Sequence, residues 1–265
     1  MRLINILKVR GNFMNNLTMP VFKTIYKRKP AKIFMSFGLF PILIMIISFL
    51  PTNFMQIGGI DNSMSFMDFF DLCQSVVFDT VLPLVAFIYL IIYSINQEIE
   101  KGTLYLFKDL DRNKIIDAKI KSIILVYVVF SLITFLAALI AYYIHFKNLS
   151  YGSGEFISSI ISDRETMWIS LIGKLYIYII TIVIAVFLSI RFNNSITLVV
   201  TLFFALFSSV SEKLGFSKYL FPNSYYKIYS QFGFGKAILI MTGLLIIYLA
   251  IFYTLSRKYF KKLEF

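Results

Sequence analysis

Residues 123–144 read IILVYVVFSLITFLAALIAYYI, a run that contains no charged side chain. A helix needs about 20 apolar residues to cross the hydrocarbon core of a bilayer, and this run is long enough. The whole chain of 265 residues has the same character, since 58% of its residues are hydrophobic and 15% are charged. Ordinary globular proteins have about 45–50% and about 25%. The sequence therefore predicts an all-α integral membrane protein.

Five other segments qualify or nearly qualify as spans, which predicts a six-helix transmembrane domain over residues 33–255. The predicted spans cover residues 33–50, 76–95, 123–144, 168–190, 196–210 and 237–255. Pro41 and Pro83 fall within the first two spans and predict kinks, because neighbouring helices can satisfy the carbonyl groups that a proline leaves unpaired. Residues 1–32 place apolar and polar side chains on opposite faces of a helix, so we expect an amphipathic helix in the membrane interface.

The distribution of lysine and arginine predicts the orientation. An even number of spans puts both termini on one side, together with residues 96–122 and the basic tail over 256–265. That side holds 19 of the 26 basic residues, and the other side holds 6. Since cytoplasmic loops are enriched in Lys and Arg, both termini are expected in the cytoplasm. The net charge of +12 is then explained by topology and anionic lipid, and we expect no nucleic-acid partner.

The rare residues exclude several kinds of chemistry. Cys73 is the one cysteine and His145 the one histidine, so neither an intrachain disulfide nor a site with two His or two Cys ligands can form. The nearest approach to a phosphate-binding loop, Gly235-Lys236, is followed by alanine where the motif requires Ser or Thr. The sequence predicts no metal site, cofactor or enzyme activity in this chain, and any ATP would be bound by another chain.

The predicted cytoplasmic loop over residues 96–122 carries a recognisable pattern. It contains Glu98-x-Glu100-x-Gly102-Thr103-Leu104, then Asp111-Arg112, and then Ile115-Ile116-x-x-Lys119. This pattern resembles the loop after the second of six spans in type-2 ABC transporter permeases, which reads roughly Glu-x-Glu-x-Gly-Thr-Leu, then Ser-Arg and a Gly-Lys. The chain departs from that pattern with Asp111 for the serine and Ala118 for the glycine. The resemblance covers the six-span layout and, as a motif, this loop alone.

The resemblance implies a transport subunit. In that family two permease chains, identical or sister chains, form the membrane pathway, and two separate ATPase subunits bind ATP and Mg²⁺ beneath them. The loop would be a coupling helix on the ATPase, with these candidate coupling residues: Glu98, Glu100, Gly102, Thr103, Leu104, Phe107, Arg112 and Lys119. It further implies an exporter in a bacterial cytoplasmic membrane, whose cargo is an amphipathic or antimicrobial peptide, for export or self-immunity, or a lipid-like molecule.

The segment over residues 211–236 contains eight aromatic side chains and is expected on the outer side. One interpretation is an aromatic belt at the membrane interface. The other is a pair of short re-entrant helices that caps the pathway from outside, as in members of the family. In that case the candidates for an outer gate are Phe221, Tyr225 and Tyr226.

Charged side chains inside the predicted spans are costly and therefore informative. Lys174 lies about 9 Å below the outer end of the fourth span, where its side chain could also reach outward to water. Asp79 lies at a similar depth in the second span, which suggests an Asp79–Lys174 pair. An alternative function is a stand-alone secondary transporter or channel, a class that uses interrupted helices and intramembrane carboxylates. A membrane-embedded enzyme is the least favoured class.

Overall fold

The computed structural model describes residues 17–50, 58–100 and 111–262, with the backbone alone for residues 97–100. These residues form helices and no strand; Met64 and Gly152 make one isolated bridge. Five helices are long and apolar enough to cross a membrane, or six if one bent pair counts as a single span. The prediction of an all-α membrane protein is confirmed at this level.

The described helices follow one another with few long connections. The α-helices are α2 (Thr18–Tyr26), α3 (Lys29–Ser36), α4 (Phe40–Ser48), α5 (Phe66–Asp79), α6 (Val81–Glu100), α7 (Arg112–Ile144), α8 (Ile161–Arg191), α9 (Asn194–Val210) and α10 (Phe234–Lys261). The short 3₁₀ helices are η1 (Phe37–Leu39), η3 (Phe146–Asn148), η4 (Ser211–Lys213), η5 (Phe216–Tyr219), η6 (Pro222–Lys227) and η7 (Tyr229–Gln231).

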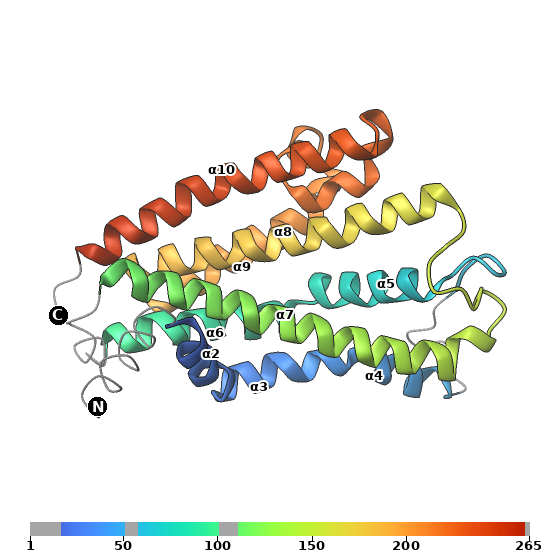
Figure 1. Ribbon diagram of the computed structural model, residues 1–265, viewed down its shortest axis with the longest axis horizontal. Coiled ribbons are helices and arrows are strands. Elements are labelled where there is room, and N and C mark those ends of the chain that lie inside the picture. Colours follow the sequence, from blue (N-terminus) through green and yellow to red (C-terminus); the bar gives the residue numbers. More distant parts are fainter. Residues whose placement is uncertain (1–16, 51–57, 101–110, 263–265) are drawn as a thin grey trace, which may run out of the picture.

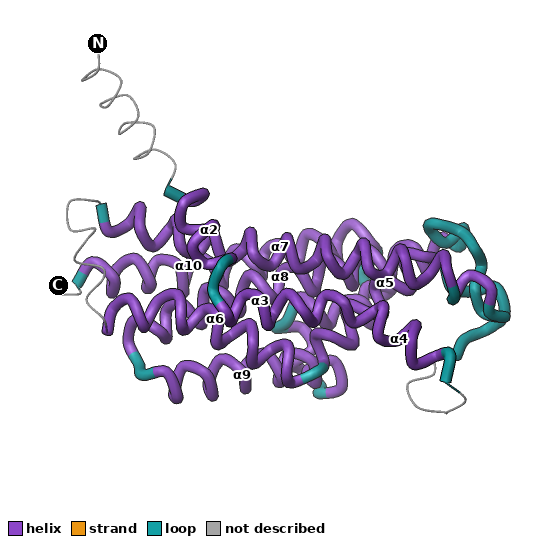
Figure 2. Tube along the Cα trace, turned by 90° about the horizontal axis from the view of Figure 1, so that it is seen from below, coloured by secondary structure: helices purple, strands orange, loops and turns teal. Residues whose placement is uncertain are grey.

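The long helices lie side by side along the longest axis of the molecule (Figure 1). We call the end that holds Arg112, Arg191 and Lys261 the basic end, and the end that holds His145 and Ile161 the far end. From one edge of Figure 1 to the other the order is α10, α8, α7 and then α3 with α4. Figure 2 shows α9 along the side away from α2 and α7. The aromatic core between α3, α6, α7 and α8 includes Phe34, Phe87 and Phe130, which are fully buried.

The first span includes a proline turn. It covers Lys29–Ser48 and consists of α3, η1 and α4. Pro41 lies in the first turn of α4, where a missing N–H costs nothing, and the preceding turn over Phe37–Leu39 is 3₁₀. Where a kink was predicted at Pro41, the structure therefore has a short 3₁₀ turn just before the proline. An amphipathic helix was predicted for residues 1–32, of which residues 1–16 lie outside the described residues. The helix α2 packs on α7, where the Ser122 hydroxyl donates to the Thr18 carbonyl.

The second span differs most from its prediction. Residues 76–95 were expected as one helix, but α5 and α6 meet at an angle of 71°. Thr80 is extended between them (φ −84°, ψ 130°), and Pro83 lies in the first turn of α6. Residues 66–75, expected in a loop, belong to α5, which begins at a capping box between Ser65 and Asp68. In Figure 1, α5 occupies the far half of the bundle and α6 the basic half.

The remaining spans keep their predicted places and extend beyond them. The helices α7, α8 and α10 each continue past the predicted apolar run toward one or both ends. Asp111 caps α7, its carboxylate accepting from the Asn113 N–H at 2.9 Å, and Asn193 caps α9 in the same manner. With 17 residues, α9 is about 25 Å long, so it is the shortest of the spans that a single described helix forms.

Candidate functional site

A buried ion pair lies inside the helix bundle. Lys174 of α8 is 8% exposed, and its Nζ lies 2.7 Å from Oδ1 of Asp71 on α5. The same ammonium donates to the Asp71 backbone carbonyl at 2.9 Å. The lysine therefore points into the bundle and does not reach outward to water. Charges at such a place are stable only when they are paired and hydrogen-bonded, and this pair meets both conditions.

The predicted Asp79–Lys174 pair is therefore corrected, since the partner of the lysine is Asp71. Asp79 is the last residue of α5 and its side chain is exposed. Asp71 lies two helical turns earlier, where α5 packs against α8. Asp71 was not predicted as the partner because residues 66–75 were expected in a loop. The helical spacing of Asp71 and Gln74 within an aromatic segment was the signal that could have found it.

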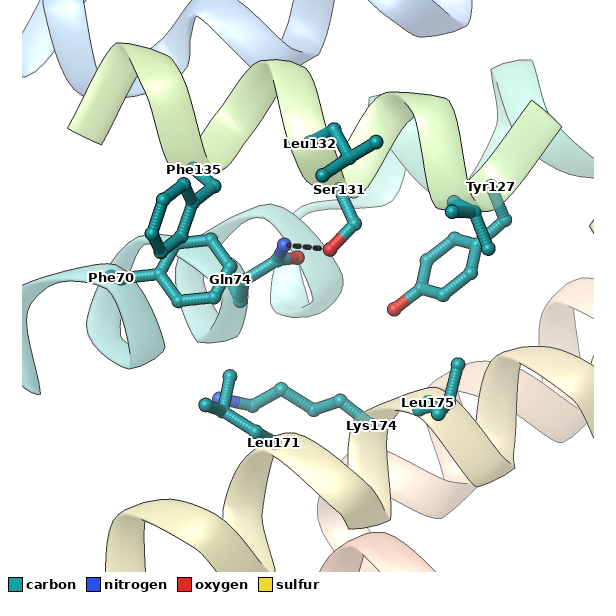
Figure 3. Close-up of a pocket in the computed structure, with 10 residues that line it drawn as sticks. Phe70, Gln74, Tyr127, Ser131, Leu132, Phe135, Leu171, Lys174 and Leu175 are labelled. Atoms are coloured by element: carbon teal, nitrogen blue, oxygen red, sulfur yellow. Dashed lines mark hydrogen bonds between the residues drawn. The ribbon is translucent and has the colours of Figure 1, made fainter. Parts of the chain in front are cut away.

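The ion pair borders a pocket of about 310 Å³ between α5, α7 and α8 (Figure 3). Most of the lining is apolar, with Phe70 and Phe135 on one side and Leu171 and Leu175 on another. Its polar lining side chains are Gln74, Tyr127, Ser131 and Lys174. The Gln74 amide donates to the Ser131 hydroxyl at 3.0 Å. The result is an apolar chamber with a small number of polar groups, which is the usual character of a small-molecule site.

One face of α8 lines the pocket, and another face contacts the segment that precedes α10. Leu171, Lys174 and Leu175 face the pocket, whereas Gly173 faces the segment over residues 211–233, which we call the outer segment. A Cβ atom on Gly173 would lie 2.9 Å from the Asn223 Cα and from the Pro222 carbonyl oxygen. A glycine is therefore required where the two backbones approach. Gly173 lies roughly 18 Å along α8 from its start at the far end, so the outer segment reaches deep along this helix.

The outer segment is built from the short 3₁₀ helices η4, η5, η6 and η7, where a pair of short re-entrant helices was one of the two interpretations. Of the gate candidates, Phe221 and Tyr225 are buried, and Tyr226 is half-buried. The Tyr226 hydroxyl donates to one Glu212 oxygen and Lys227 Nζ lies on the other, each at 2.6 Å. Burial and the adjacent Glu212 carboxylate raise the pKa of Tyr226 well above its ordinary value. Tyr226 thus joins η6 to η4 within the outer segment.

The coupling candidates fall in different parts of the chain. Gly102, Thr103, Leu104 and Phe107 lie outside the described residues, as do the side chains of Glu98 and Glu100. Arg112 donates to the Lys261 carbonyl at 2.7 Å and so joins the start of α7 to the end of α10. Lys119 is 3% exposed and donates to the Ser94 carbonyl of α6. The Lys119 ammonium therefore joins α6 to α7 inside the bundle, and the coupling role of Lys119 stays a prediction.

Further polar contacts join the helices at the basic end. Arg257 of α10 lies 3.0 Å from the Asp117 carboxylate of α7, which also accepts from the Tyr253 hydroxyl at 2.8 Å. Arg191 of α8 donates to the Tyr259 hydroxyl of α10 at 2.8 Å. The helices α7, α8 and α10 are therefore linked at the basic end.

No family model, no curated protein and no solved structure matches this chain. The resemblance to type-2 ABC permeases therefore depends on the loop pattern and the span layout alone. The structure has three features that bear on function: a buried ion pair, a pocket beside it, and an outer segment that approaches α8 closely.

Proposed function

We propose that the chain is the permease subunit of an ATP-driven ABC exporter in a bacterial cytoplasmic membrane. The observation that carries the proposal is the position of the motif. Helix α6 runs to Glu100 and α7 begins at Arg112, so the Glu-x-Glu-x-Gly-Thr-Leu pattern falls at the junction of the second and third spans, at the basic end. A bias of basic residues toward this end agrees with a cytoplasmic location. A partner ATPase would bind there and supply ATP and Mg²⁺.

The contacts at the basic end give this proposal a mechanical basis. A force on residues 101–110 acts on the ends of α6 and α7. The Lys119 bond to Ser94 joins these two helices, and the Asp117–Arg257 pair joins α7 to α10. Movement of the loop would therefore be transmitted to three helices together. Rigid elements linked by such contacts are the kind of path through which coupling travels.

The outer segment would act as the outer gate of the proposed pathway. It dips along α8 from the far end, and Gly173 allows its backbone to approach that helix closely. Phe221 contacts the rings of Phe204 and Phe207 on α9 at centroid distances of 5.5 and 5.7 Å. A gate of this kind would open by separating from α8 and α9. The proposed cargo is an amphipathic peptide or lipid-like molecule, and a second permease chain, identical or sister, would complete the pathway.

The test is recovery of partner proteins from native membranes with the tagged chain, followed by mass spectrometry. We compare the wild type with the double variant Glu100→Lys/Gly102→Trp. The matched control is Asp61→Lys/Gly58→Trp at the far end, where Asp61 is exposed and a Cβ atom on Gly58 would meet no described atom within 4 Å. We expect an ABC ATPase with the wild type and the control, and its loss with the loop variant. A folded wild type that recovers no ATPase would contradict the proposal.

A second candidate function is a stand-alone secondary transporter or channel. Two observations favour it, namely the break between α5 and α6 and the Asp71–Lys174 pair inside the bundle. Interrupted helices and paired intramembrane charges are both found in secondary transporters. Transport by the purified chain in vesicles without any ATPase would support this candidate. Transport that requires an ATPase and ATP would exclude it.

A further inference from the structure

The pocket between α5, α7 and α8 opens sideways. Its lining includes Val128 and Leu132 of α7 and Leu175 of α8, which are 39%, 56% and 36% exposed on the outer surface of the bundle. Ser131 and Lys174 each lie roughly 20 Å from the far end and at least 25 Å from the basic end of their helices. The mouth is therefore in the middle part of the bundle, where the surroundings of a membrane protein are hydrocarbon. A ligand would enter the pocket from the lipid.

The inner wall of the pocket presents polar groups that lack partners. Gln74 and Tyr127 are 3% and 4% exposed. One N–H of the Gln74 amide donates to the Ser131 hydroxyl. The carbonyl oxygen and the second N–H of this amide have no hydrogen-bond partner among the residues that the structure describes. The same is true of the Tyr127 hydroxyl, which points into the space between α7 and α8 (Figure 3). These atoms face the open pocket, so a polar group that enters from hydrocarbon gains a hydrogen bond to them, a contribution of about 0.5–1.5 kcal/mol.

The charge of the pocket decides which polar group it accepts. Lys174 is the only charged side chain among the lining residues, and its ammonium already lies on Asp71. The wall is therefore neutral overall. An anionic or cationic ligand would lose its hydration without gaining an unpaired counter-ion, which is unfavourable. An uncharged ligand with a hydroxyl, amide or ester group bears no such cost.

We propose that this pocket binds an uncharged amphiphile, an apolar body that carries one hydrogen-bonding group, which enters from the hydrocarbon between α7 and α8. The polar group lies against Gln74 and Tyr127, and the apolar body fills the space between Phe70, Phe135 and Leu171. The volume of about 310 Å³ is at the lower end of the range for ligand pockets. The inference depends on the pocket alone and is independent of any ATPase partner.

Photolabelling tests the proposal on the full chain, purified and reconstituted in phosphatidylcholine vesicles. The probe is an octanol that carries a diazirine, and mass spectrometry locates the adducts. We expect saturable labelling on pocket residues of α7 and α8. Unlabelled octanol should suppress this labelling at a concentration at least tenfold lower than octane or octanoate requires. Val128→Phe, which narrows the mouth, reduces this labelling at least tenfold. Leu136→Phe is the matched control, because Leu136 is exposed on the same helix and lies outside the lining.

Two further variants test the polar wall. Gln74→Leu and Tyr127→Phe keep most of the side-chain volume and remove hydrogen-bonding groups, and each weakens competition by octanol about tenfold while competition by octane is unchanged. If one of them fails to fold, the other still tests the wall. Octane that competes as well as octanol would overturn the proposal, and so would labelling that Val128→Phe leaves unchanged. Absence of saturable labelling would likewise overturn the proposal.

Discussion

Replacing Lys174 by methionine removes the cation and leaves the Asp71 carboxylate inside the bundle. The two groups are 2.7 Å apart, and at an effective dielectric constant of about 20 two unit charges at that distance attract each other by roughly 6 kcal/mol. Lost hydration of both groups offsets much of this attraction. The measurable effect is the cost of one uncompensated buried charge, about 3–5 kcal/mol. We therefore expect Lys174→Met to lower the free energy of unfolding by that amount.

The assay is unfolding of the purified chain in mixed micelles with increasing sodium dodecyl sulfate, followed by circular dichroism. The double variant Asp71→Leu/Lys174→Met removes both charges, and we expect it to lose about 1 kcal/mol or less, because apolar side chains of similar size often replace a buried ion pair without loss. The two single variants and the double variant form a thermodynamic cycle that isolates the interaction.

Asp79→Asn serves as the control in this assay. Asp79 is exposed at the end of α5, so we expect a change within about 0.5 kcal/mol. A double variant that loses as much stability as the two single variants added together would show that Lys174 and Asp71 do not stabilise each other. The assignment of Asp71 as the partner would also be wrong if Asp79→Asn lowered the free energy of unfolding as much as Lys174→Met while Asp71→Leu had little effect.

Two further predictions concern the outer segment. Gly173→Leu brings a Cβ to 2.9 Å from the Pro222 carbonyl oxygen and should lower the free energy of unfolding by about 1–3 kcal/mol, whereas Gly243→Leu, with open space around it, should change it little in the same assay. Tyr226 should remain protonated in the folded chain at a pH where exposed tyrosines ionise, because its pKa is raised by burial and by Glu212. Its contribution to stability is complete below the unfolded pKa of about 10 and is lost as the pH rises above that value. Glu212→Gln should lower the pKa of Tyr226, as measured by ultraviolet titration against Tyr226→Phe, and an unchanged titration would contradict the proposed contact.

Much of the fold follows from local properties of the sequence. The apolar runs over 123–144, 168–190 and 237–255 lie within α7, α8 and α10, because a long apolar segment in hydrocarbon must satisfy its backbone internally as a helix. Asp111 was predictable as a cap since its side chain can accept from a backbone N–H at the start of α7. These features depend on residues close together in the chain.

The candidate site depended on contacts that composition does not specify. The sequence marked Lys174 as an unusual charge inside a span, and Asp79 was predicted as its partner from its depth along a single continuous second span. The real helix breaks at Thr80, and the residues before the break form α5 against α8. Gln74, Tyr127 and Ser131 carry no sequence signal for a pocket, because polar residues in a span more often bond to neighbouring helices.

The amino-acid sequence was enough to predict a bundle of helices apolar enough to span a membrane, with most of the basic residues expected on one side. Transfer of apolar residues into hydrocarbon and the hydrogen-bonding needs of the backbone are local properties of each segment. Only the tertiary structure decided that Lys174 meets Asp71, that Gly173 admits the outer segment, and that Gln74 and Tyr127 face a common pocket. The rotation, tilt and bending of each helix are set by packing against its neighbours, and these three contacts depend on that packing.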